Sequence, residues 1–308
     1  MELRQLRYFI RVVDLGSFGR AAKEFDLVTS ALSQQIGRLE TELSTRLLHR
    51  SPMGVLATDA GLAFYRQAQL ALRHVDDAIV AAQQARLSGH VSLGLAPSTA
   101  AVLALPYMQA MRNRYPDVRL RLVESLSSNL SAMFDSRQLD LAMLFDAVTA
   151  RRGHAVPLVR ERLFLIGSRQ MPEMLALPEK RVEIRDITAM PLVLGSLGVR
   201  HDVDAAFARV QCVPQVAMEI DGLPVLLDAV RAGLGATIQP GAAIVRLPAG
   251  TLRSIEIADI DACRLSTMVS LRDEELSPAV LAARIVLRDT ARQVIDAGHW
   301  PGASFVEG

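Results

Sequence analysis

The sequence predicts an α/β protein with a small helical unit at its start and a larger region of alternating strands and helices behind it. Three observations lead to this prediction. Residues 17–40, SFGRAAKEFDLVTSALSQQIGRLE, have the pattern of two short helices joined by a tight turn. A single long helix is expected over residues 60–87, and from His90 strands alternate with helices. A chain of 308 residues, half of them apolar, is long enough for two or three domains with buried cores.

The first helix is expected over residues 3–14, where apolar side chains recur at helical spacing. Its apolar face consists of Leu3, Leu6, Phe9, Ile10 and Val13. Gly16 ends this helix, and Ser17 can cap the next one. The small pair Ala21-Ala22 allows that second helix to pack closely against a third.

The third helix has two contrasting faces. Apolar residues spaced 4, 3 and 4 positions apart form a buried face, namely Leu32, Ile36, Leu39 and Leu43. The other face carries short hydrogen-bonding groups and one cation, namely Thr29, Ser30, Ser33, Gln34 and Arg38. Such groups suit base edges in the DNA major groove, where Gln34 can donate to and accept from adenine. Alternatively these are solvated positions, and Arg38 pairs with Glu42 at i,i+4.

A two-stranded wing is expected within residues 44–57, because Pro52 and Gly54 favour a turn there. Arg50 in this wing is a candidate for contact with a phosphate or with the minor groove. Together with the helix-turn-helix pattern, the wing predicts a winged helix-turn-helix.

The long helix begins with an N-cap, Thr58, and a first-turn acid, Asp59. Apolar residues along it repeat at spacings of 3, 4 and 3, which favours pairing of two subunits. These residues are Leu72, Val75, Ile79 and Ala82. The alternative is that this helix lies on its own domain.

After Ser88-Gly89 the pattern changes to strands and helices in alternation. Strands are expected at 91–96, 118–125, 139–145, 163–167, 191–195, 216–220, 235–239 and 266–271. Helices are expected at about 100–115, 127–137, 201–211, 223–232 and 277–297. This order predicts parallel sheets in two subdomains with a cleft between them, and a loose tail after Gly298.

Ligands of open α/β sheets bind beyond the carboxyl ends of the strands, near helix N-termini. The candidate ligand-binding residues at such places are Pro97, Ser98 and Thr99, then Ser125, Ser127 and Ser128, then Ser196, Arg200 and His201. Hydroxyls, backbone N–H groups and Arg200 together favour a small anion such as a carboxylate. Taken singly, each hydroxyl would instead cap a helix, and His201 would be a surface residue.

Composition and charge exclude several classes of protein. The net charge is +1, and residues 1–60 hold 8 Arg and Lys against 7 Asp and Glu, so tight DNA binding needs two copies of the motif.

Cys212 and Cys263 form no metal or disulfide pattern and are expected to be buried structural residues rather than redox sensors. No nucleophile–base pair points to an enzyme, and no cofactor or metal is expected. The start MELRQLRYF is no signal peptide and no apolar run approaches 18 residues, so a cytoplasmic protein without membrane association is expected.

The segments RQLRYFIRVVDLGSFGRAAKEF, ALSQQIGRLETEL, and LLHR followed by GVLATDAG resemble the LysR-type transcriptional regulators, and the resemblance covers nearly the whole chain. It implies a winged helix-turn-helix at 1–58, a linker and dimerisation helix at 59–88, and a periplasmic-binding-protein-like effector domain at 89–308. Subdomain I would span about 89–161 and 268–300, and subdomain II about 162–267. The implied partners are promoter DNA, further copies of the chain in a homodimer or homotetramer, and RNA polymerase.

QLRYF, SALSQQI and SGHVSLGLAPSTAA are most similar to the nitrogen assimilation control group of this family, some members of which act without a co-inducer. Val28-Thr29-Ser30 stands where the family usually has Ser-Gln-Pro. The serine hydroxyl that caps the helix in the family, worth on the order of 1 kcal/mol, is therefore absent. The glutamine that reads a base in the family is absent as well. Thr29 or Ser30 is therefore expected to cap the helix. Met53 stands where a second basic wing residue is common.

We therefore expect a transcriptional regulator that responds to a small anionic metabolite. The alternatives are an effector-independent regulator of the nitrogen-assimilation type and a solute-binding protein. The expected DNA-binding residues are Arg20, Thr29, Ser30, Ser33, Gln34, Arg38, Arg50 and Ser51.

Overall fold

The computed structural model describes residues 1–51, 54–83, 87–145, 153–196, 198–245, 247, 250–259 and 262–306. Contacts along the chain divide it into two compact units, Met1–Gly89 and His90–Gly308, and each is described by itself. In the described ranges, no helix combines the length and the apolar character needed to cross a membrane.

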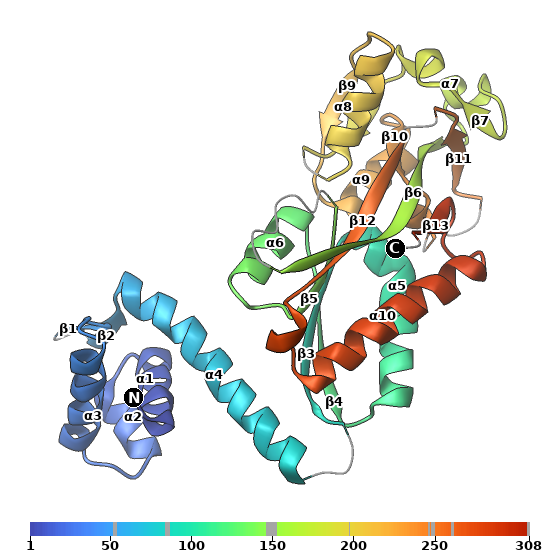
Figure 1. Ribbon diagram of the computed structural model, residues 1–308. Coiled ribbons are helices and arrows are strands. Elements are labelled where there is room, and N and C mark those ends of the chain that lie inside the picture. Colours follow the sequence, from blue (N-terminus) through green and yellow to red (C-terminus); the bar gives the residue numbers. More distant parts are fainter. Residues whose placement is uncertain are drawn as a thin grey trace. The chain divides into compact units, whose positions relative to one another are not determined.

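The first unit is a helix-turn-helix with a two-stranded wing, followed by one long helix (Figure 1). Its elements are α1 (Leu3–Leu15), α2 (Phe18–Glu24), α3 (Thr29–Glu42), β1 (Leu48–Ser51), β2 (Gly54–Ala57) and α4 (Asp59–Gln83). Most of the apolar residues expected on α1 and α3 meet in one core that includes Phe9, Leu32, Ile36 and Leu39. The prediction is wrong for Leu3, which is 45% exposed, whereas Val12 is fully buried. Strands β1 and β2 pair antiparallel, so the predicted wing is confirmed.

Helix ends in this unit follow local sequence signals, with one exception. Gly16 adopts a left-handed conformation with φ 60 and ends α1. The Ser17 hydroxyl accepts a hydrogen bond from Arg20 N at 3.3 Å, and Thr58 Oγ1 accepts one from Gly61 N at 2.9 Å. The cap predicted for α3 is wrong, because the N-cap is Val28, which has no side-chain acceptor. Thr29 and Ser30 already lie inside the helix, so their hydroxyls do not occupy the N-cap position.

The second unit is built around a mixed sheet with the strand order β4-β3-β5-β12-β6-β11-β7, and β10 and β13 also pair with β6. The strands are β3 (Gly89–Leu95), β4 (Val118–Glu124), β5 (Leu141–Phe145), β6 (His154–Ser168), β7 (Arg181–Val182), β10 (Thr237–Pro240), β11 (Leu252–Ile257), β12 (Cys263–Ser270) and β13 (Ala303–Phe305). A separate parallel pair is formed by β8 (Leu192–Leu194) and β9 (Val216–Glu219).

The sequence predicted parallel sheets, and this is correct only for part of the unit. The pairs β3–β5, β7–β11 and β8–β9 are parallel, but β12 runs antiparallel to both of its neighbours. The remaining partners of β6, namely β10, β11 and β13, are antiparallel as well. The cause is that β6 is a single strand of 15 residues, far longer than the five residues expected for it, and other strands return along its length.

Helices cover both faces of the sheet (Figure 1). They are α5 (Pro97–Arg114), α6 (Ser127–Asp135), α7 (Pro172–Leu175), α8 (Arg200–Arg209), α9 (Leu223–Arg231) and α10 (Pro278–Asp296), with short 3-10 turns η2 (Ile184–Ile187), η3 (Gly241–Ile244) and η4 (Asp273–Glu275). Alternation along β5 separates two clusters: Leu141 and Met143 pack with α5 and α10, whereas Ala142 and Leu144 pack with α6. A further cluster gathers Leu163, Leu165, Val203 and Phe207 around β6 and α8.

Residues 299–306 are ordered, which corrects the expectation of a loose end after Gly298. Trp300 is 2% exposed, and β13 pairs with the middle of β6. Val306 N also donates a hydrogen bond to Leu158 O at 2.9 Å. The expectation of buried cysteines is wrong too, because Cys212 and Cys263 are half-buried, and neither forms a disulfide.

Candidate nucleic-acid interface and small-molecule pocket

Helix α3 presents the predicted polar face to solvent. Thr29, Ser30, Gln34 and Arg38 are exposed, and Ser33 is half-buried. On the opposite side, Leu32, Ile36 and Leu39 have no exposed surface. One side of this helix therefore anchors it, while most of the polar residues on the other side are exposed.

The residues around this face keep it accessible. Ala21 and Ala22 are buried where α2 meets α3, and their small size allows the close approach. Glu42, which could have paired with Arg38, instead pairs with the Met1 ammonium group. Within the described part of the chain, no ion pair holds Arg38. Arg20 is exposed, and its guanidinium donates to the Leu15 carbonyl at the end of α1.

Arg50 and Ser51 lie on β1 of the wing, where Arg50 is opposite Val55 and Ser51 is opposite Gly54. Their side chains, and residues 52–53 at the tip of the wing, lie outside the described parts of the structure. The wing's part in DNA binding therefore stays a prediction.

Helix α4 packs on the first unit through residues that precede the predicted seam. The Phe64 ring packs edge-to-face on Phe9 at 5.3 Å between centroids, and Ala68 is 2% exposed. Further along, Leu72 and Val75 are half-buried and Ile79 is 47% exposed. The side chain of Ala82 is not described. Part of the first half of α4 thus lies on its own domain, and large apolar side chains are exposed in both halves, namely Leu62 at 49% and Ile79 at 47%.

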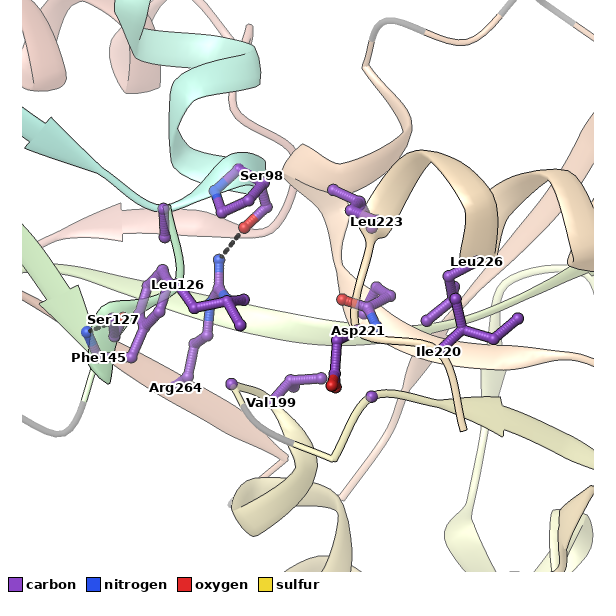
Figure 2. Close-up of a pocket in the computed structure, with 15 residues that line it drawn as sticks. Ser98, Leu126, Ser127, Phe145, Val199, Ile220, Asp221, Leu223, Leu226 and Arg264 are labelled. Atoms are coloured by element: carbon purple, nitrogen blue, oxygen red, sulfur yellow. Dashed lines mark hydrogen bonds between the residues drawn. The ribbon is translucent and has the colours of Figure 1, made fainter. Parts of the chain in front are cut away.

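The second unit contains a pocket of ≈ 60 Å³ where the sequence predicted a ligand site, at the starts of α5 and α6 (Figure 2). Loops that lead into α8 and α9 form the opposite wall, and β10 and β12 complete it. The described lining residues are Ala96, Pro97, Ser98, Leu126, Ser127, Phe145, Gly195, Gly198, Val199, Ile220, Asp221, Leu223, Leu226, Gln239 and Arg264.

Three of the predicted ligand residues line this pocket. Pro97 begins α5, and the Ser98 hydroxyl beside it accepts a hydrogen bond from Arg264 Nη2 at 2.7 Å. Ser127 Oγ, at the start of α6, accepts one from Phe145 N at 3.2 Å. The predicted residues that the described lining does not include are Thr99, Ser125, Ser128, Ser196, Arg200 and His201.

The cation predicted for the cleft is engaged elsewhere. Arg200 Nε lies 2.9 Å from Asp204, and its Nη1 lies 2.8 Å from Glu219. The hydrogen bonds to Glu219 and Asp204 raise the pKa of Arg200 above its ordinary value. Ser196 likewise donates to Asp221, through its backbone N at 2.8 Å and its hydroxyl at 2.8 Å. These groups stabilise the loops around the pocket.

The cation that does line the pocket is Arg264, which the sequence analysis missed. Its side chain is 5% exposed, and its Nη2 lies 3.2 Å from both carboxylate oxygens of Glu161, which is fully buried. The Arg264 guanidinium also stacks over the Phe145 ring at 3.5 Å from the centroid. Glu161 accepts further hydrogen bonds from Ser266 Oγ at 2.8 Å and Trp300 Nε1 at 3.2 Å.

One atom of this network has no partner. Arg264 Nε is buried and makes no hydrogen bond within the described structure. A buried donor without an acceptor costs about 1–3 kcal/mol, so this nitrogen is a local cost to the folded state. The position of Arg264 next to a strand of otherwise uncharged residues was a weak indication of a functional cation. Nothing in the sequence indicated that its partner would be Glu161, 103 positions earlier.

The first unit has an exposed helix with short polar groups, and the second is an α/β unit with a polar pocket. Together these features are typical of a DNA-binding regulator that also has a ligand-binding domain. Residues 3–62 match the family model "Bacterial regulatory helix-turn-helix protein, lysR family", and residues 84–292 match "LysR substrate binding domain". The chain therefore belongs to the LysR family of transcriptional regulators.

Curated relatives agree with this assignment. The chain is 35% identical over 248 residues to the nitrogen assimilation regulatory protein nac of Klebsiella aerogenes, which covers 79% of each chain. It is 30% identical over 300 residues to the uncharacterized HTH-type transcriptional regulator YnfL of Escherichia coli K12, covering 95% of this chain and 99% of that protein. These relatives are transcriptional regulators rather than enzymes, so the enzyme and solute-binding alternatives fall away.

Solved structures share the fold. A full-length OxyR point variant from Pseudomonas aeruginosa matches with a TM-score of 0.70 at 22% identity, and the match covers 95% of each chain. Full-length CbnR in complex with its target DNA matches with a TM-score of 0.66 at 22% identity, covering 94% of this chain and 100% of that one.

Proposed function

We propose that this regulator binds promoter DNA in the cytoplasm through the exposed face of α3 and the wing. The observation that carries the proposal is the division of α3 into a fully buried apolar side and an exposed side with Thr29, Ser30, Gln34 and Arg38. Gln34 would read a base edge, Ser33 and Thr29 a base or a phosphate, and Arg38 a phosphate.

Two copies of the motif would act together, as a homodimer or homotetramer. The first unit is almost electrically neutral, so one copy attracts phosphates only weakly. Ile79 on the second half of α4 is a large apolar side chain with 47% of its surface exposed, which favours pairing along that part of the helix. Two recognition helices would then read the half-sites of an interrupted palindrome, and bound copies would contact RNA polymerase.

A small molecule with an anionic group would bind in the pocket of the second unit and alter DNA binding. The supporting features are two helix N-termini, the Ser98 hydroxyl and the side chain of Arg264, all at one small cavity. The alternative is a regulator that needs no effector. It is favoured by the internal pairing of both candidate cations, Arg264 with Glu161 and Arg200 with Glu219.

The test of DNA reading is a gel-shift titration with Gln34→Ala on the gene's own upstream intergenic DNA and on random DNA of equal length. Affinity for the upstream DNA should fall by about 1–3 kcal/mol, while affinity for random DNA stays unchanged. A matched control is Gln293→Ala, which removes an exposed glutamine from α10 in the other unit. Equal losses on both DNAs would show that Gln34 does not read bases.

The same titration with and without candidate metabolites separates the two versions of the function. A change in affinity or mobility of the complex supports an effector. A shift that no metabolite alters favours the effector-independent regulator.

A further inference from the structure

Val28 is a large apolar side chain exposed at the start of α3. It is 68% exposed, whereas Leu27 before it packs against the core of the first unit. A single exposed valine is ordinary on a protein surface. This one, however, lies at one end of the proposed recognition helix, and the next two residues, Thr29 and Ser30, are exposed as well. In helix-turn-helix proteins, the N-terminal residues of the recognition helix contact base edges in the major groove.

The backbone holds Val28 firmly in this place. Val28 is the N-cap of α3 and has an extended conformation with φ -74 and ψ 143. Its carbonyl oxygen accepts hydrogen bonds from Ala31 N at 3.0 Å and from Leu32 N at 3.2 Å. Leu32 is itself fully buried, which ties this end of the helix to the core. The branched Cβ also restricts the χ1 angle of valine, so its methyl groups lose little further freedom in a complex.

The side chain of Val28 does not stabilise the helix that it begins. It accepts no hydrogen bond from the first turn, where a hydroxyl or a carboxylate would act as a cap. It is not part of the buried core either. Its two methyl groups are therefore available for contact with apolar atoms of a partner. The apolar group that a base pair presents in the major groove is the 5-methyl group of thymine.

We propose that Val28 is a specificity-determining residue that reads the 5-methyl group of thymine. Thymine would then be preferred at one position of each half-site. Removal of one methyl-sized group from water changes an affinity about fourfold. Two recognition helices on two half-sites would together give a preference on the order of tenfold. This inference rests on the proposed binding of promoter DNA through α3.

The test begins with the selection of binding sites from a random duplex library, by the full-length protein and by its variant Val28→Ser. The wild-type sites should show thymine at one position of each half-site where the variant has no preference. Thymine at that position is then replaced with deoxyuridine, which removes only the 5-methyl group. With both half-sites changed, the affinity of the wild type in a gel-shift titration should fall on the order of tenfold, and that of Val28→Ser by less than about twofold.

Controls separate this contact from effects on folding and charge. Val28→Ser supplies a hydroxyl at the N-cap, so it should not lower the melting temperature of the protein. Val213→Ser makes the same change at a valine of the second unit that is 83% exposed, and it should keep the wild-type preference for thymine. A methyl contact carries no charge, so the ratio of the two affinities should stay constant between about 50 and 200 mM salt, although both affinities fall.

The same preference for thymine in Val28→Ser as in the wild type would overturn the proposal. Equal wild-type affinities for the thymine and deoxyuridine duplexes would overturn it as well. In both cases the selected sites would still show that the protein binds specific DNA, so the proposed function would stand. If the wild type selects no preferred sequence from the library, the proposed function fails, and the role of Val28 fails with it.

Discussion

Replacing Glu161 with Gln removes the counter-charge of the pocket's cation and keeps the shape of the side chain. Both Glu161 oxygens lie 3.2 Å from Arg264 Nη2, and the side chains are 0% and 5% exposed, so little water reaches either group. In the variant, Arg264 would keep its hydrogen bond to Ser98 and its contact with Phe145. Its charge would then be buried without a carboxylate.

The magnitude follows from the burial of the pair. At this distance and an effective dielectric constant near 20, the attraction is on the order of 5 kcal/mol, and desolvation of both ions offsets part of it. Loss of one partner from a buried pair costs about 3–5 kcal/mol of unfolding free energy, because the other charge stays buried. The double variant Glu161→Gln/Arg264→Met leaves no buried charge and should recover at least about 2 kcal/mol of this loss.

Urea unfolding measures both values. Trp300 fluorescence reports the second unit, and far-UV circular dichroism reports the whole chain. Glu183→Gln, which removes an exposed carboxylate paired with Arg185, should change the free energy by less than about 0.5 kcal/mol and serves as the control. If the effects of Glu161→Gln and Arg264→Met simply add in the double variant, the two groups are not coupled and the reasoning is wrong.

Three further predictions concern the first unit. Ile36→Ala should lower its unfolding free energy by about 2–5 kcal/mol in urea, because Ile36 is fully buried on the apolar side of α3. A loss below about 1 kcal/mol would contradict that packing. Gly61→Ala should lower the free energy of unfolding by about 1–3 kcal/mol, because a Cβ there would lie 2.0 Å from the Leu47 carbonyl oxygen. The measurement is the melting temperature, which should fall. An unchanged melting temperature would refute this close approach. Burial and the hydrogen bond to Asp14 raise the pKa of Tyr65 from 10.0 to about 12. The neutral phenol of Tyr65 therefore contributes fully to the free energy of unfolding below pH 10, and this contribution is lost as the pH rises to about 12. Tyr65→Phe should remove this part of the alkaline stability profile, and absorbance of the phenolate should show one titration fewer above pH 10.

The first unit could be predicted from the sequence because its signals are local. Gly16 ends α1 in a left-handed conformation, the Ser17 hydroxyl caps the start of α2, and the Thr58 hydroxyl caps the start of α4. Each of these helix ends lies within a residue or two of its expected position. The start of α3 was different. Two hydroxyl residues followed Val28, and only the backbone conformation decides that the helix begins after the valine rather than after one of them.

The second unit was harder because its decisive contacts join distant residues. Arg264 and Glu161 meet only after β6 and β12 pair in antiparallel register, where Arg264 is opposite Glu161. Arg200 was expected in the cleft, but Asp204 four residues later on the same helix was a local signal for its ion pair. Trp300 becomes buried because β13 returns to β6, which no periodicity in the last residues predicts.

The length of β6 limits how the second unit can change shape. Its first residues pair with β12, whereas Leu163 to Ser168 pair with β10 and β11, so one continuous strand belongs to both halves around the pocket. Wide opening of the cleft would break ladder hydrogen bonds at this crossing. We therefore expect that a ligand twists the backbone of β6 only slightly. The stiffness of this strand would then set how much of the binding energy is converted into movement.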